Sequence, residues 1–124
     1  MLLVPTHVAV SKIAGVGLFA SEHIKAGTPI WRVDPRIDLL FSAAEIAAFP
    51  PAVQEFFKVY AYPHNRQVGK MMFNIDNGRF MNHSKSPNTE FVGFDTGSAI
   101  ADIAAGEEMT CDYGEFNADF HGGF

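Results

Sequence analysis

The sequence predicts a mainly β fold with a small helical insert (α+β), built as several short, curved sheets. Apolar and polar residues alternate over short segments such as residues 6–10 and 89–94, which is the pattern of half-buried strands. Glycine-containing turns separate these segments, and 11 glycines in the chain favour curved strands over one flat sheet. Helix signals are confined to an insert at about residues 42–62.

The expected strands follow one another with a turn between each pair. Gly15 and Gly17 mark a backbone bend or a close approach by another group. An Asp-Asn-Gly turn is expected at residues 76–78, and a turn at residues 95–97 is expected to join two strands into a hairpin. The expected strands cover residues 6–10, 29–33, 70–75, 89–94, 98–103 and 109–114.

The insert is expected to hold two short helices. Ser42 with Glu45 three residues later forms a capping-box pattern, and Pro50-Pro51 ends the first helix. The second helix begins at Ala52 and ends before Pro63. Its expected apolar face holds Val53, Phe56, Phe57 and Tyr60.

Composition and charge exclude several classes of function. With 124 residues, of which 48% are hydrophobic, the chain is expected to be one domain over residues 1–124. The formal net charge of −5 argues against direct binding of nucleic acid, which needs clustered basic residues, but permits a basic partner. No apolar run is long enough to span a membrane.

The N-terminal residues and the cysteine count bear on the compartment. Pro5 and His7 interrupt the apolar N-terminus too early for a signal peptide. The single cysteine, Cys111, excludes an internal disulfide and a multi-cysteine zinc site, and it fits a reducing compartment. We therefore expect a cytoplasmic protein, with export to a host cell left open.

Residues 79–91 set Asn82, His83 and Ser84 side by side, and three interpretations are open. A metal site is disfavoured because the other histidines are scattered along the chain. A serine nucleophile is disfavoured because the Gly-x-Ser-x-Gly pattern is absent. On these residues alone a hydrogen-bonded turn is favoured, because Asn and Ser bond to their own backbone.

Three segments taken together change the preference for a simple hydrogen-bonded turn. They are SKIAGVGLFASEHIKAGTPI at residues 11–30, RFMNHSKSPN at residues 79–88 and GEEMTCDYGEF at residues 106–116. The first is a weak signal alone, whereas the other two are specific runs. In this order and over nearly the whole chain, they resemble the SET-domain protein lysine methyltransferases, in particular the compact bacterial and viral members.

The resemblance implies a fold and an arrangement of its parts. Small sheets would surround a knot-like crossing, as in SET and β-clip domains, with the segments around Asn82-His83 and Tyr113 packed against each other. The helical insert would help to shape the substrate groove. The C-terminal tail, residues 115–124, would close the lysine channel.

The resemblance also implies site residues for S-adenosylmethionine and for the reaction. Asn82 and His83 would hold the cofactor, and Tyr113 would be the catalytic tyrosine that orients the lysine amine. The loop whose backbone approaches the cofactor would be Ala14, Gly15, Val16 and Gly17. The substrate is a lysine side chain of a protein, expected to be basic, histone-like or ribosomal.

Several residues depart from the family pattern. Lys85 stands where many nuclear relatives have a zinc-binding cysteine, so no metal is expected and aromatic rings must close the channel. Phe116 and Phe120 are the candidates, whereas Phe124 is favoured as a core cap or disordered end. The expected channel residues are Tyr62, Cys111 and Phe116.

Other features stay open at this stage. Cys111 stands where relatives have an aromatic residue, so the number of methyl groups is open, and Tyr60 or Tyr62 is a source of a hydroxyl. Glu107 and Glu108 are interpreted as a solvated turn. A β-clip binding module or an inactive relative that binds peptide is the alternative function, and a homodimer is left open.

Overall fold

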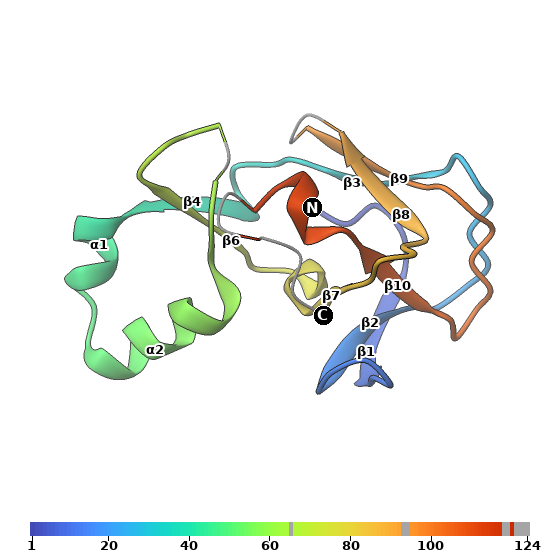
Figure 1. The fold of residues 1–124 in the computed structure, drawn as a ribbon, viewed down its shortest axis with the longest axis horizontal. Coiled ribbons are helices and arrows are strands. Elements are labelled where there is room, and N and C mark those ends of the chain that lie inside the picture. The colour runs from blue at the N-terminus through green and yellow to red at the C-terminus, as the bar shows by residue number, and fades with distance from the viewer. Residues whose placement is uncertain (65, 93–94, 118–119, 121–124) are drawn as a thin grey trace.

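The computed structural model describes residues 1–64, 66–92, 95–117 and 120 (Figure 1). The mainly β prediction is confirmed, because these residues form three small sheets with two short helices. The sheets contain four, three and three strands. No helix among the described residues is long and apolar enough to cross a membrane.

The four-stranded sheet joins the specific sequence motifs. In spatial order it contains β1 (Thr6–Val10), β2 (Val16–Ala20), β10 (Glu108–Cys111) and β7 (Asn82–His83). The first three strands pair antiparallel, whereas β10 and β7 run parallel, with Thr110 opposite Asn82 and Cys111 opposite His83. Parallel neighbours require a long crossover. Residues 84–107 make that crossover, and we call the β7–β10 pair the crossing.

The second sheet contains β3 (Pro29–Arg32), β9 (Thr96–Ala99) and β8 (Thr89–Val92). The hairpin is found, but its second strand begins at Thr96, so the prediction of a turn over residues 95–97 was wrong in position. Gly97 lies opposite Phe91, whose ring fills the space of a β-carbon at this glycine. Gly97 is therefore a strand residue that accommodates a large ring.

The third sheet contains β4 (Asp38–Ser42), β6 (Lys70–Asn74) and β5 (Tyr62–Pro63). Between β4 and β5 lie α1 (Ala43–Ala47) and α2 (Pro51–Tyr60). Figure 1 shows both helices at one end of the molecule, beside β4 and β6 and away from β1, β3 and β9.

The predicted capping box of α1 is confirmed. The Ser42 hydroxyl accepts from the Glu45 amide at 3.1 Å, and the Glu45 carboxylate accepts from the Ser42 amide at 2.8 Å. The predicted apolar face of α2 is only partly buried, because Phe57 is enclosed whereas Phe56 is 41% exposed. Phe57 packs against four other rings, Phe41, Phe49, Phe56 and Phe73.

The segment after β6 is a 3-10 helix, Asn77–Phe80, rather than a hairpin turn. The Asp76 carboxylate caps it by accepting from the Gly78 amide at 3.0 Å. This helix leads into Met81, which lies in the main core, and then into β7. The turn thus delivers the motif segment into the centre of the molecule.

We predict that Ser42→Ala lowers the free energy of unfolding by about 1 kcal/mol, because the Glu45 amide loses its acceptor. Urea denaturation of the variant and the wild type measures the difference. Ser86→Ala, at an exposed serine outside any helix, serves as the control. Equal stability of Ser42→Ala and the wild type would contradict the role given to the cap.

Candidate active site

The parallel pairing of β7 with β10 brings the two specific motifs into contact. The Ser84 amide donates to the Cys111 carbonyl at 2.9 Å, which extends the pairing beyond β7. Asn88 then bonds to the backbone of β10 on both sides of Met109. Its side-chain amide donates to the Glu108 carbonyl at 2.8 Å, and its oxygen accepts from the Thr110 amide at 2.9 Å. Residues separated by twenty or more positions are thereby fixed against each other.

Tyr113 is fixed by both its backbone and its side chain. Its hydroxyl donates to the Met81 carbonyl at 2.7 Å, and its amide donates to Nδ1 of His83 at 3.1 Å. Because a backbone amide can only donate, Nδ1 accepts, and the proton of the neutral ring lies on Nε2. His83 is buried and therefore acts as a support for Tyr113.

The side-chain amide of Asn82 ties down the loop before β2. It lies within hydrogen-bonding distance of the Ala14 carbonyl at 3.2 Å and the Val16 carbonyl at 3.1 Å. It also reaches the Ser11 hydroxyl at 3.1 Å and the Glu108 carboxylate at 3.0 Å. Its Oδ1 accepts no hydrogen bond from a described residue, so it is open to a ligand.

The two glycines of this loop have different roles. Gly15 has a φ of +49°, in the left-handed region that favours glycine. Gly17 is buried, and a β-carbon there would collide with the Glu108 carboxylate and lie 3.1 Å from Nδ2 of Asn82. Gly15 thus makes the bend, and Gly17 lets the carboxylate and the amide approach the backbone.

The interpretation of Glu108 as part of a solvated turn was wrong. The Ser11 hydroxyl donates to this carboxylate and lies 2.8 and 2.9 Å from its two oxygens, in addition to the Asn82 contact. A carboxylate with these partners is a structural anchor between β10 and the loop. Glu107 beside it is exposed, and among the described residues its carboxylate accepts a hydrogen bond only from Asn88, at 3.4 Å.

Two hollows lie at this crossing, and no described residue lines both of them. An open depression is lined by Ile13, Ala14, His83, Ser84 and Lys85. A cavity of about 260 Å³ lies beside Tyr113 and is also lined by the three predicted channel residues, Tyr62, Cys111 and Phe116. Of the predicted cofactor residues, Ala14 and His83 line the depression, whereas all three predicted channel residues line the cavity.

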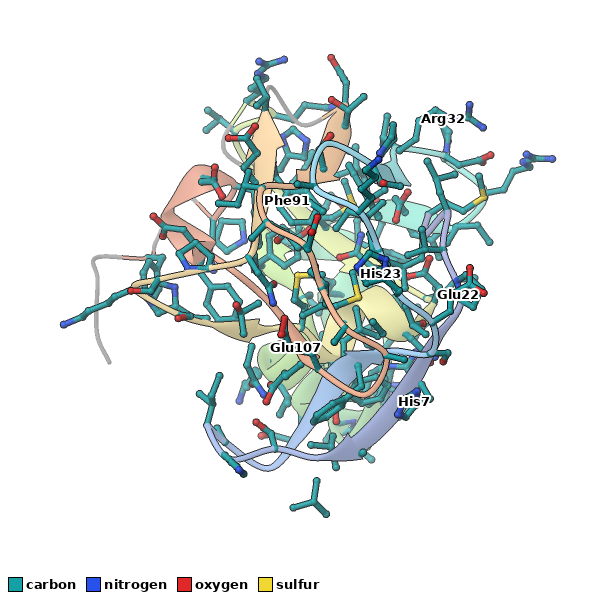
Figure 2. All side chains as sticks on the ribbon, turned by 90° about the vertical axis from the view of Figure 1, so that its right-hand side faces the viewer. His7, Glu22, His23, Arg32, Phe91 and Glu107 are labelled. Carbon is teal, nitrogen blue, oxygen red and sulfur yellow. The ribbon has the colours of Figure 1, made fainter. Side chains whose placement is uncertain are left out.

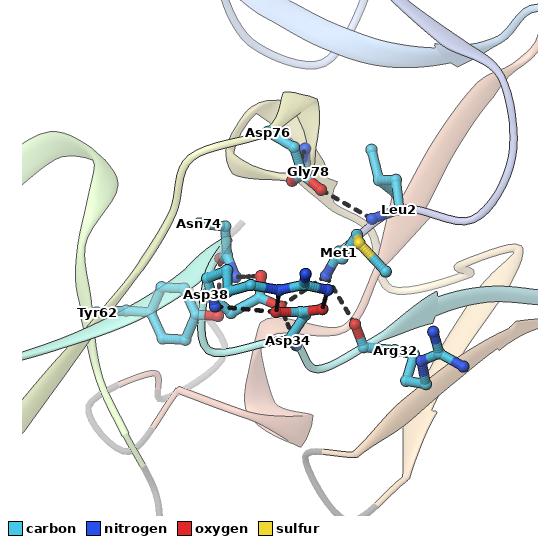
Figure 3. A network of polar contacts seen from close by, with 10 residues as sticks. Met1, Leu2, Arg32, Asp34, Asp38, Tyr62, Asn74, Asp76 and Gly78 are labelled. Carbon is cyan, nitrogen blue, oxygen red and sulfur yellow. Dashed lines mark hydrogen bonds and ion pairs between the residues drawn. The ribbon is translucent and has the colours of Figure 1, made fainter.

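Tyr62 reaches the cavity from β5 and is held by a polar network (Figure 3). Its hydroxyl donates to Asn74 at 3.0 Å, and the Asn74 amide donates to Asp38 at 2.8 Å. Asp38 also lies 2.6 Å from the amino group of Met1. Because the Tyr62 hydroxyl gives its proton to Asn74, it can only accept a hydrogen bond from any other group.

Burial raises the pKa of two phenols and the thiol in the cavity wall. It raises the pKa of Tyr113 to about 12 and that of Tyr62 further. Cys111 is 1% exposed, and burial raises the pKa of its thiol well above the usual range. All three groups are therefore protonated at neutral pH.

The C-terminal rings continue the aromatic wall. Phe116 lies 5.9 Å from Tyr113 and 5.2 Å from Tyr62, measured between ring centroids. Phe120 lies 4.5 Å from His83 and 5.5 Å from Tyr113. The prediction for Phe124 lies outside the described residues. Among the described residues, no group of three or more His, Cys, Asp or Glu side chains is placed to hold a metal ion.

Sequence reasoning missed several residues of this site. Asn74 and Asp38 carry no local signal, because their partners lie in other strands of the third sheet. Phe91 packs edge-on against Phe116, with 5.5 Å between ring centroids. The alternation of β8 predicts the side of the strand on which Phe91 lies, but not the ring that it contacts. Asn88 was visible beside Pro87, although nothing nearby in sequence shows that it bonds to β10.

A family model described as the SET domain matches residues 15–114. No curated protein sequence matches the chain. Several solved structures are similar to it in fold.

Three solved structures illustrate the likeness. A humanized mutant of the Chaetomium thermophilum Polycomb Repressive Complex 2, bound to an inhibitor, is 23% identical with a TM-score of 0.63, over 94% of this chain and 16% of that chain. The complex in an autoinhibited conformation bound to S-adenosylmethionine is 22% identical with a TM-score of 0.64, over 94% and 16%. A Plasmodium falciparum protein assigned as a histone methyltransferase is 19% identical with a TM-score of 0.62, over 90% and 95%.

These likenesses support the fold. The chain spans about a sixth of the Polycomb chains, but nearly the whole of the Plasmodium protein.

We predict that Gly17→Ala destabilises the fold by about 1–3 kcal/mol, because its β-carbon meets the Glu108 carboxylate between two strands. Gly106→Ala is the matched comparison. A β-carbon there meets open space, so the only cost is the strain of an alanine at a left-handed φ of 83°. Chemical denaturation measures both variants. A smaller loss for Gly17→Ala than for Gly106→Ala would contradict the close approach.

We predict that stability falls as the pH rises above about 9. In the unfolded chain the thiol and the phenols lose protons near their usual values of 9.0 and 10.0, whereas in the folded chain the pKa values of Cys111, Tyr62 and Tyr113 are raised. Their contribution is complete below those values and is lost as the pH rises towards 12. Urea midpoints between pH 7 and 11 measure the decline. An equally steep decline in Tyr113→Phe would contradict the part assigned to Tyr113.

Proposed function

Because the chain belongs to the SET-domain family, matched over residues 15–114, we propose that it is a protein lysine N-methyltransferase that uses S-adenosylmethionine. One observation carries the proposal. The paired segments β7 and β10 place the Ala14–His83 depression next to the cavity that Tyr113 lines. A methyl group would pass between a cofactor on one side and a lysine on the other.

The loop and β7 fit a charged organic cofactor. Ala14, Gly15 and Val16 are exposed, and the Asn82 contacts hold this loop in place. The Asn82 Oδ1 atom is open to an ammonium or hydroxyl donor. S-adenosylmethionine supplies a methyl group on a positively charged sulfur. We expect Ala14, Gly15, Asn82 and His83 to contact it through backbone and side-chain atoms.

The cavity fits a lysine that must react as the neutral amine. A lysine side chain has a reference pKa of about 10.4, so most of it is charged at neutral pH. Among the described residues, no carboxylate lines the cavity, and six of its sixteen lining residues are aromatic. Such a wall disfavours the ammonium form and lowers the pKa of a lysine that enters.

Tyr113 is better suited to orient the amine than to remove its proton. Burial raises the pKa of its phenol to about 12, so the phenolate is scarce at neutral pH. Its proton is also donated to the Met81 carbonyl at 2.7 Å. The hydroxyl oxygen and the Met81 carbonyl would therefore accept from an amine or from polarised methyl C–H groups.

Tyr62 is a second orienting group in this proposal. Its hydroxyl donates to Asn74 and can accept from the lysine amine. Together with the small Cys111, it would set how many methyl groups the cavity accommodates. We propose a protein substrate from the cytoplasm. We propose that this substrate is basic overall, which the net charge of −5 supports. We also propose a homodimer in which the partner adds surface to the groove, because a chain of 124 residues offers little surface of its own.

We predict that Tyr113→Phe lowers the rate of methyl transfer by about a hundredfold, because the amine loses a fixed hydrogen-bonding group. Transfer of labelled methyl groups to lysine-rich proteins measures the effect. Thr96→Val is the control, because it removes an exposed hydroxyl on β9 that lines neither hollow. Full transfer by Tyr113→Phe, or none by the wild type, counts against the enzyme. Ligand binding without transfer supports the binding module or the inactive relative.

A further inference from the structure

The cavity wall carries positive charge although the protein is acidic overall. Lys58 from α2 and Arg79 from the 3-10 helix both line it. No described aspartate or glutamate lines it, while the whole chain has a formal net charge of −5. A hollow that is basic within an acidic protein favours an anionic group on its ligand.

The guanidinium of Arg79 is held in one position. Its Nη1 atom donates to the Ile75 carbonyl at 2.9 Å and to the Asp76 carbonyl at 3.3 Å. The group also lies 4.4 Å from the centre of the Phe80 ring and 5.8 Å from that of Tyr60. Because two rings and two carbonyls already fix this cation, it loses little conformational freedom when a ligand binds.

Two of the guanidinium nitrogens of Arg79 have no acceptor among the described residues. Nε is buried, and Nη2 donates to none of them. Asp76, the nearest acid in sequence, uses its carboxylate on the amides of Leu2 and Gly78, at 2.8 and 3.0 Å. Nη2 is therefore the atom that can donate a charge-assisted hydrogen bond to a ligand carboxylate.

Lys58 marks the solvent side of the same wall. It pairs with Glu55 at 2.6 Å, but both side chains are 70% exposed. An exposed pair within one helix contributes little to stability, so Lys58 can exchange this partner for a ligand at small cost.

We propose that the Arg79 and Lys58 wall binds an acidic side chain of the substrate, so that the enzyme selects lysines with aspartate or glutamate close by in the sequence. This inference rests on the proposed function. The target lysine enters the cavity beside Tyr113, while the neighbouring carboxylate accepts from Nη2 of Arg79. A substrate protein can still be basic overall, because selection acts on the residues beside the target.

The test uses the full chain and peptides that contain one central lysine. At each flanking position the peptides carry Asp, Asn or Lys, and transfer of labelled methyl from S-adenosylmethionine gives kcat/KM. We expect Asp to exceed Asn by about tenfold at one or two positions, as for a hydrogen-bonded charge pair. Transfer without preference for Asp, or with preference for Lys, overturns the inference and leaves the proposed function standing. Transfer to no peptide overturns both.

Variants assign the preference to the wall. Arg79→Gln should remove the preference for Asp, and Lys58→Glu, on an exposed helix surface, should weaken it or shift it towards Lys. Arg32→Gln is the matched control, since Arg32 is exposed on β3 and lies outside the cavity wall (Figure 2). An unchanged preference in Lys58→Glu and in folded Arg79→Gln overturns the assignment. The wild-type series decides the inference even if Arg79→Gln does not fold.

Discussion

The parallel pairing of β7 with β10 is the contact on which the rest of the structure depends. It is short, with only two residues of β7, and side chains reinforce it at both ends. Asn88 bonds to the backbone of β10, and Tyr113 bonds to Met81 and His83. Because these groups are partly or wholly buried, each lost partner would leave an unpaired polar atom away from water. The crossing is therefore held in one register, which fixes the loop on one side and the cavity on the other.

Burial at this crossing also sets the chemistry. The same aromatic and apolar wall that raises the pKa of Tyr113 to about 12 would lower the pKa of a lysine amine beside it. An enzyme built this way would need no strong base in the wall. Under the proposed function, the wall would supply fixed acceptors for the amine, and its basic residues would add selectivity for what lies next to the lysine.

The local elements were predictable because their signals are local. The capping box of α1 and the strand β1 depend on neighbours in sequence, and both are found. The site residues were assigned through a resemblance of motifs, and the structure brings Asn82, His83 and Tyr113 together. Glu108 was misinterpreted because its partners, Ser11 and Asn82, are distant in sequence. The network from Tyr62 to Asp38 was missed for the same reason, since no periodicity records a contact between separate strands.

The most direct test of this arrangement is to titrate S-adenosylmethionine into the isotopically labelled protein and to follow the backbone amide resonances by NMR. The largest shifts are expected at residues 13–17 and 82–85, around the open depression, with smaller shifts at Tyr113 through its bond to His83. Shifts confined to another surface, such as residues 33–41 beside β4, or no shifts at millimolar cofactor, would contradict a cofactor site at the β7–β10 crossing.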